Sequence, residues 1–165
     1  MLAAFAVIIF VLALGYAGLR DLMSYEIPNW VSLVVVAAFL VMALANSVDL
    51  ATVGWHLSAG GVVLIVGAVL FYTGVFGGGD AKLLAASAVW FGWPKLLPFF
   101  LEVAIVGGVL ALIILCLRRF RLPVSWAEKA WLQRLCGGEK GIPYGVAIAL
   151  GGILVLRGVP LGTLV

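Results

Sequence analysis

The sequence predicts an all-α membrane protein that crosses the bilayer several times. Hydrophobic residues make up 65% of the 165-residue chain and charged residues only 10%, whereas soluble domains carry about 25% charged residues. A soluble globule built from this sequence would expose large apolar patches. The composition therefore excludes an ordinary cytosolic domain, a disordered chain and a nucleic-acid-binding module.

Long apolar runs predict six transmembrane helices, which leave no room for a soluble domain. They lie at roughly residues 2–19, 30–46, 52–72, 80–93, 97–117 and 143–160. The first run does not have the flanks of a signal peptide, because no Lys or Arg precedes it and Arg20 follows it directly. The fourth run is the weakest, since Pro94 and Pro98 are expected to end it. A re-entrant segment is the alternative there.

The distribution of basic residues predicts that both chain ends lie on the outer side of the membrane. With the N-terminus outside, the first, third and fifth loops face the cytoplasm. These loops contain Arg20, Lys82, Arg118, Arg119, Arg121, Lys129, Arg134 and Lys140. The opposite side holds only Lys95 and Arg157. This asymmetry follows the positive-inside rule. With five spans it would be weaker, because Lys82 and the basic residues of the fifth loop would lie on opposite sides of the membrane.

Residues 118–142 form the one sizeable polar segment, and we expect a short amphipathic helix there on the cytoplasmic leaflet. Ser125 and Glu128 have the spacing of a capping box. One helical face would carry Val124, Ala127, Trp131 and Leu135. The basic excess of the segment suits anionic lipid head groups. A solvated connector is the alternative interpretation.

Three acidic residues are candidates for chemistry, namely Asp21, Asp80 and Glu102. Asp21 follows the predicted first helix and Asp80 the third, and these helices run in the same direction. Both aspartates should therefore emerge on the same, cytoplasmic face. Glu102 lies about one turn into the fifth predicted helix, near the outer side, where its shallow depth favours an interfacial or snorkelling role. A functional carboxylate there would instead indicate ion or proton coupling. Solvation explains the remaining acids, which are Glu26, Asp49, Glu128 and Glu139.

The two aspartates stand in unusual local sequences. Gly77 to Gly79 precede Asp80, and successive glycines permit positive φ and a close backbone approach, so that an extended peptide could lie against them. Asp80 is then expected to be the N-cap of the fourth helix, with Lys82 in its first turn. After Asp21, Pro28 restricts Ile27 to an extended conformation, and a helix can begin just beyond it. Ordinary inter-helix turns are the alternative at both places.

Two carboxyl groups within a few ångströms of each other cannot both ionise cheaply, so such a pair shares a proton. The pair would supply one general base and one general acid, as in aspartic proteases. Which aspartate is the base stays open. Cys116, Cys136 and His56 are too far apart in the sequence to indicate a zinc site, and we expect no metal.

Three motifs, in this order and spacing, resemble the type IV prepilin peptidases. They are Asp21 with Ile27-Pro28-Asn29, then Gly77-Gly78-Gly79-Asp80-Ala81-Lys82-Leu83, and finally Ile142-Pro143-Tyr144-Gly145-Val146-Ala147. The chain looks most like the short form associated with Flp (tight-adherence) pili. The likeness runs from the first predicted helix to the last, which implies one transmembrane peptidase domain over residues 1–165.

The resemblance implies a GxGD-type aspartic endopeptidase of the bacterial inner membrane that needs no cofactor. Its partner would be a prepilin, whose basic leader is cut at the cytoplasmic face just before a hydrophobic helix. Carried over by motif, Asp21 and Asp80 would be the catalytic pair. Loop shaping or substrate binding would fall to Gly77, Gly78, Gly79, Lys82, Pro28 and Asn29. Both chain ends would then be periplasmic.

The chain departs from the longer members of that family, which carry paired C-x-x-C motifs and also methylate the new N-terminus. Those motifs are missing here, so the resemblance implies peptidase activity without methyl transfer. A small proton- or ion-coupled transporter that uses Asp21, Asp80 and Glu102 is the alternative function, although no inverted repeat supports it. A non-catalytic scaffold is a third, since small-residue pairs such as Gly145 and Ala149 favour close helix packing. The oligomeric state is not indicated.

Overall fold

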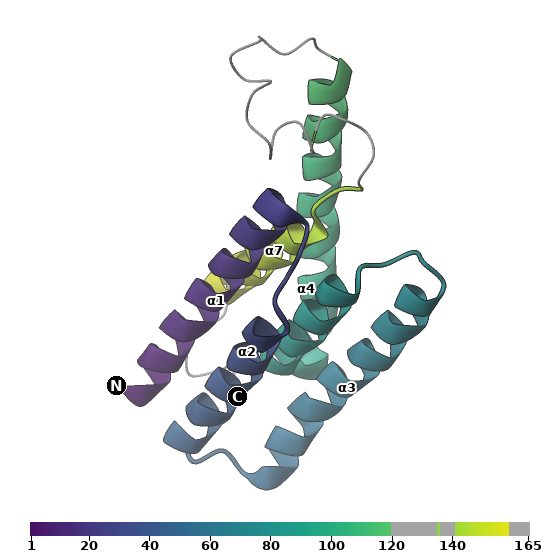
Figure 1. Cartoon of the computed structure of the whole chain (residues 1–165). Coiled ribbons are helices and arrows are strands. Elements are labelled where there is room, and N and C mark those ends of the chain that lie inside the picture. Colours follow the sequence, from purple (N-terminus) through teal and green to yellow (C-terminus); the bar gives the residue numbers. More distant parts are fainter. Residues whose placement is uncertain (120–134, 136–140, 159–165) are drawn as a thin grey trace.

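The computed structural model describes residues 1–119, 135 and 141–158, and this part of the chain is helical without any strand (Figure 1). The helices are α1 (Leu2–Ser24), α2 (Asn29–Ala45), α3 (Leu50–Tyr72), α4 (Gly78–Arg119) and α7 (Tyr144–Arg157). The predicted all-α class is therefore confirmed for the described residues. The amphipathic helix expected within residues 118–142 falls almost entirely outside them.

Helix α4 consists of two arms that meet at Gly92, whose φ of 57° and ψ of −174° are not helical. This backbone conformation is essentially restricted to glycine. We call residues 78–91 the first arm and residues 93–119 the second arm. The break was expected at Pro94 and Pro98, and that expectation is wrong, because both prolines lie inside the second arm. Pro94 falls in its first turn, where a helix requires no backbone donor.

The two arms run in opposite directions. In the first arm, Ala81 packs on Gly67 and Val89 on Gly60, so that this arm is antiparallel to α3. In the second arm, Val103 packs on Gly151 of α7. The predicted division of this region into two helices, 80–93 and 97–117, thus agrees with the structure except for the position of the break. In Figure 1 the second arm continues well beyond the ends of the other helices.

His56 stabilises the reversal at Gly92. Its ring stacks on Phe39 with centroids 5.3 Å apart, and its Nδ1 donates to the Val89 carbonyl at 2.8 Å. Val89 lies in the last turn of the first arm, where carbonyls lose their intrahelical donors. A Cβ on Gly92 would lie 2.8 Å from His56 Cε1. The lone histidine of the chain therefore has a structural role at this turn.

Trp90 holds α1, α2 and the first arm together at the centre of the core. It is fully buried, and its indole Nε1 donates to the Val35 carbonyl at 2.8 Å. Phe10 of α1 stacks on it with centroids 4.3 Å apart. An indole N–H must find a partner when it is buried, and the Val35 carbonyl fixes the register of α2 against α4. This register fixes how the first residues of α2 and the first residues of α4 lie relative to each other along the bundle.

Small residues hold α7 close to its neighbours on two faces. A Cβ on Gly18 of α1 would lie 3.2 Å from the Ala149 Cβ, and one on Gly152 would lie 2.9 Å from Leu14. The opposite face presents Gly151 to Val103 of the second arm. Backbones can approach this closely only where side chains are small. Helix α7 therefore packs between α1 and the second arm.

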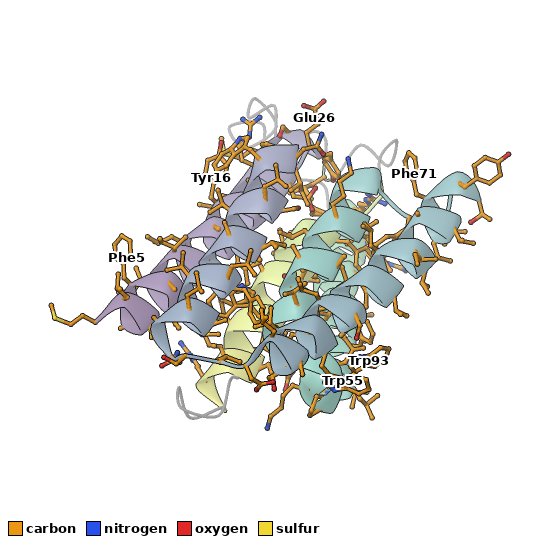
Figure 2. The ribbon with its side chains drawn as sticks, turned by 90° about the horizontal axis from the view of Figure 1, so that it is seen from below. Phe5, Tyr16, Glu26, Trp55, Phe71 and Trp93 are labelled. Atoms are coloured by element: carbon orange, nitrogen blue, oxygen red, sulfur yellow. The ribbon has the colours of Figure 1, made fainter. Side chains whose placement is uncertain are left out.

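The outer surface of the bundle is apolar, as a bilayer requires. Helices α1, α3 and α4 are long and apolar enough to cross a membrane, and α2 and α7 are shorter apolar helices. Large side chains such as Phe5 and Phe71 project from the bundle with more than half of their surface exposed (Figure 2). These features indicate a multi-pass membrane protein. Six spans with both ends outside stay a prediction.

We expect Gly92→Ala and His56→Ala to destabilise the fold in detergent. The first change forces alanine into a conformation that costs about 1–3 kcal/mol and into contact with the His56 ring. The second leaves the Val89 carbonyl buried without its donor, at a similar cost. The measurement is the thermal unfolding midpoint. Gly108→Ala is the control, because a Cβ there meets nothing within 4 Å; an equal midpoint for all three variants would contradict the proposed role of this turn.

Candidate active site

Asp21 lies in the last turn of α1 rather than beyond its end. The helix was expected to stop near residue 19, and it continues to Ser24. No proline or glycine interrupts residues 19–24, so the helix ends only where Tyr25 adopts a left-handed conformation with φ 57°. The Tyr25 amide donates to the Asp21 carbonyl at 2.8 Å. The aspartate is thus held on a regular helix, and its side chain faces the bundle.

The side chain of Asp21 is anchored by the start of α7. Only 5% of Asp21 is exposed, and its Oδ2 accepts the backbone N–H of Gly145 at 2.6 Å. Gly145 is the second residue of α7, and a helix N-terminus favours a neighbouring negative charge. A Cβ on Gly145 would lie 2.8 Å from Asp21 Oδ2 and 2.7 Å from Ile27 Cδ1. Only glycine allows the amide to come this close.

Asp80 was expected to be the N-cap of α4. It lies instead within the first turn of that helix. The helix begins at Gly78, and the Ala81 amide already donates to the Gly77 carbonyl at 3.0 Å. The side chain turns back over Gly77, where a Cβ would lie 2.6 Å from Asp80 Oδ2. Asp80 Oδ1 is buried and has no hydrogen-bond partner among the described residues. A buried polar atom of this kind is unusual in a native structure.

Asp21 and Asp80 line the same cleft, whose volume is about 460 Å³. The cleft lies between the end of α1, the connection 25–28 and the start of α4. Across it the two carboxyl groups interact electrostatically. The structure therefore brings together the two acids that the topology argument placed on one face. Glu102, the third candidate, does not line this cleft.

The glycines before Asp80 serve close packing. A Cβ on Gly79 would lie 3.1 Å from the Ile27 Cβ and 3.4 Å from the Ile27 carbonyl oxygen, and one on Gly78 would lie 3.2 Å from the Phe71 ring. Among the described glycines, positive φ occurs at Gly74 and Gly92 and not at residues 77–79. Of the two properties expected of this glycine run, the close approach is the one that the structure uses.

The other predicted site residues meet at the edge of the cleft. Pro28 is extended, with φ −63° and ψ 135°, and α2 begins directly after it at Asn29. Lys82 Nζ donates to Asn29 Oδ1 at 2.8 Å, which joins the starts of α2 and α4. Pro28 and Asn29 line the cleft, whereas Lys82 does not. Lys82 therefore acts on the cleft through Asn29.

Sequence reasoning missed several residues of the site. Gly145 was considered as part of a motif and as a helix-packing residue, but not as a partner of Asp21, and this contact spans 124 positions along the chain. Glu26 is exposed, as expected of a solvated acid, but it also lines the cleft together with Arg20 and Tyr25, and Figure 2 shows it at the rim of the bundle. Arg20 Nε is buried without a hydrogen-bond partner in the described chain. A sequence feature that could have indicated the role of Gly145 is a glycine in the first turn of a helix whose N-cap is a proline, here Pro143.

No metal-binding group is apparent within residues 1–119 and 141–158, where no three His, Cys, Asp or Glu side chains are suitably grouped. A comparison with protein-family models matches residues 8–112 to the type IV leader peptidase family. The matched segment contains both Asp21 and Asp80 and ends before Gly145. No curated protein and no solved structure matches the chain. The match covers more than half of the sequence, and the chain belongs to the type IV leader peptidase family.

Proposed function

We propose that the protein is a membrane-embedded aspartic endopeptidase that removes the basic leader from Flp-type prepilins. Membership of the type IV leader peptidase family supports the peptidase class. The aspartic mechanism rests on one observation: the buried Asp21 and the half-buried Asp80 line one cleft at one end of the bundle. Two such groups supply a base and an acid without any other catalytic group.

The surroundings of the two aspartates support different roles for them. The Gly145 amide and the start of α7 stabilise a negative charge on Asp21, so Asp21 is the general base. Asp80 has an unpartnered buried oxygen and Asp21 as its neighbour, so Asp80 holds the proton of the pair. Neither residue needs to leave its helix for this division of roles.

The reaction follows from these roles. Asp21 takes a proton from a water molecule, whose oxygen attacks the carbonyl carbon of the scissile peptide bond, while Asp80 gives its proton to the carbonyl oxygen. The tetrahedral intermediate then collapses. Asp21 passes its proton to the leaving amine nitrogen, and Asp80 recovers a proton from the intermediate. Water is consumed, the peptide bond breaks, and both aspartates return to their starting states.

The positions of basic residues support a cleft that opens to the cytoplasm. Arg20 lines the cleft and Lys82 bonds to its edge, whereas Lys95 follows the break at Gly92, at the far end of the first arm. Figure 2 shows Trp55 and Trp93 at the end of the bundle opposite Glu26, as an interfacial belt would require. We therefore assign the protein to the bacterial inner membrane, with six spans and periplasmic ends.

Partners follow from the same proposal. The substrate is a prepilin whose basic leader meets the acidic cleft, in which Glu26 joins the two aspartates. Methyl transfer is not part of the activity. The basic excess in the sequence of residues 118–142 supports anionic lipid as a further partner. The transporter alternative lacks support, because its third acid, Glu102, is not in the cleft.

Asp21→Asn and Asp80→Asn should each lower prepilin cleavage by at least about 10²-fold, because each removes one partner of the proton transfer. The measurement is co-expression with a prepilin, followed by a gel that separates the precursor from the cut form. Glu102→Gln is the matched control and should cut normally. Both asparagine variants should still accumulate in the membrane. Retained cleavage in either variant would remove that residue from the mechanism.

Gly145→Ala should lower cleavage by about 10²-fold, since the added methyl displaces the Asp21 carboxyl group from its place. The same gel measures the effect, with membrane accumulation recorded in parallel. Gly141→Ala is the control, because a Cβ there meets nothing within 4 Å. Normal cleavage by Gly145→Ala would show that the anchor of Asp21 is dispensable.

Cleavage by the purified protein should depend on pH as a bell-shaped curve. At low pH both carboxyl groups are protonated and no base is left, while at high pH both are ionised and no acid is left. The measurement is the initial rate of prepilin cleavage in lipid vesicles, with thermal stability recorded at each pH. A rate that stays level into the alkaline range, where the protein is still folded, would argue against a shared proton.

A further inference from the structure

An apolar groove of about 540 Å³ lies next to the cleft, between α2, α3 and the first arm of α4. Helices α2 and α3 each pack on the first arm but hardly on one another. They are joined at the end near Asn46 and Asp49, and Figure 1 shows them diverging away from that connection. The groove therefore lies between two helices that separate from each other toward the end of the bundle that carries the aspartates.

The floor of this groove is made of small residues. Ala85 and Ala86 of the first arm are buried, and they line the groove together with Gly60 and Gly61 of α3. A Cβ on Gly61 would meet nothing within 4 Å, so its backbone faces open space. Leu33 of α2, which is 71% exposed, forms part of one wall. Small residues on an apolar surface are the usual contact sites for another transmembrane helix.

The groove and the cleft meet at Asn29, which lines both. Its partner Lys82 lines the groove only. Asn29 and Lys82 are thus the boundary between an apolar surface in the membrane and the two carboxyl groups. From Asn29 to Val36 the wall of the groove covers eight residues of α2, or about 10 Å of helix.

We propose that this groove binds the substrate's own apolar transmembrane helix, over the first two turns that follow the cleaved bond. This rests on the proposed function. A helix in the groove would lead its polar, N-terminal end across Asn29 and Lys82 directly to Asp21 and Asp80. The length of the groove matches two helical turns, and its lining is apolar apart from Asn29 and Lys82 at one end and Ser32, one turn further along α2.

The test compares two substrates on the purified full chain. One is an intact prepilin, and the other is a short soluble peptide that contains the leader and the cleaved bond but no apolar helix. Gly61→Leu fills the groove without touching the cleft. It should raise KM for the intact prepilin by about 10-fold or more, and it should leave cleavage of the soluble peptide unchanged. Gly108→Leu, on the second arm, is the control for an added side chain at an open glycine.

Cross-linking keeps the proposal falsifiable if Gly61→Leu folds poorly. In the uncut complex formed with Asp80→Asn, a cysteine at Leu33 or Leu64 should cross-link to cysteines in the first two turns of the substrate helix. A cysteine at Leu112, which is exposed on the second arm, should not. Three results would overturn the proposal: equal effects of Gly61→Leu on both substrates, no effect on either substrate, or cross-links at Leu112 alone. A groove that is filled by lipid chains would give one of these results.

Failure of the proposed function would look different. In that case the unmodified protein would cut neither the intact prepilin nor the soluble peptide. Cleavage of both substrates by the unmodified protein, without a selective effect of Gly61→Leu and without cross-links at Leu33 or Leu64, would reject the groove and retain the peptidase.

Discussion

The hydrogen bond from the Gly145 amide to Asp21 is the contact on which the candidate site depends. It joins the end of the first helix to the start of the last, across 124 positions of sequence. Asp21 is almost completely buried, and a carboxylate in such a place is costly unless it is paired. A hydrogen bond to a charged group contributes about 1.5–3 kcal/mol, and the loss of this one would leave a buried charge unpartnered. The contact therefore fixes both the position of Asp21 and the docking of α7.

Main-chain groups and glycine contacts position the two aspartates in this candidate site. Gly145 brings its amide to Asp21, Gly79 brings α4 against Ile27, and Gly77 makes room for the Asp80 carboxyl group. Each of these contacts is closer than any larger residue would permit. The backbone positions that carry the two carboxyl groups are consequently fixed by main-chain packing, and the Gly145 amide also holds the Asp21 carboxyl group itself. A site of this kind is preorganised by the fold itself.

The features that were predicted correctly depend on patterns that act over short distances. Apolar runs predicted α2 and α3 to within two residues at each end, because the length of a membrane helix follows from its run of apolar residues. The order of the helices was sufficient to bring Asp21 and Asp80 to one end. This conclusion survived the errors at the helix ends, since α1 is longer than expected and α4 begins before Asp80.

The features that were missed depend on contacts that only the folded chain reveals. Prolines are strong helix breakers in general, yet the break in α4 falls at Gly92, where His56 from another helix supplies a donor. The role of Gly145 likewise depends on a partner at the opposite end of the sequence. Glu26 is exposed as expected, but its position near a helix end did not indicate that it lines the cleft opposite the glycine segment.

The family match ends at residue 112, and the anchor of Asp21 comes later, in α7. During synthesis both aspartates therefore leave the ribosome well before the amide that orients one of them. A nascent chain that has inserted α1 to α4 holds the acids but not their final arrangement. Assembly of the last helix is then the step that gives the Asp21 carboxyl group its backbone partner.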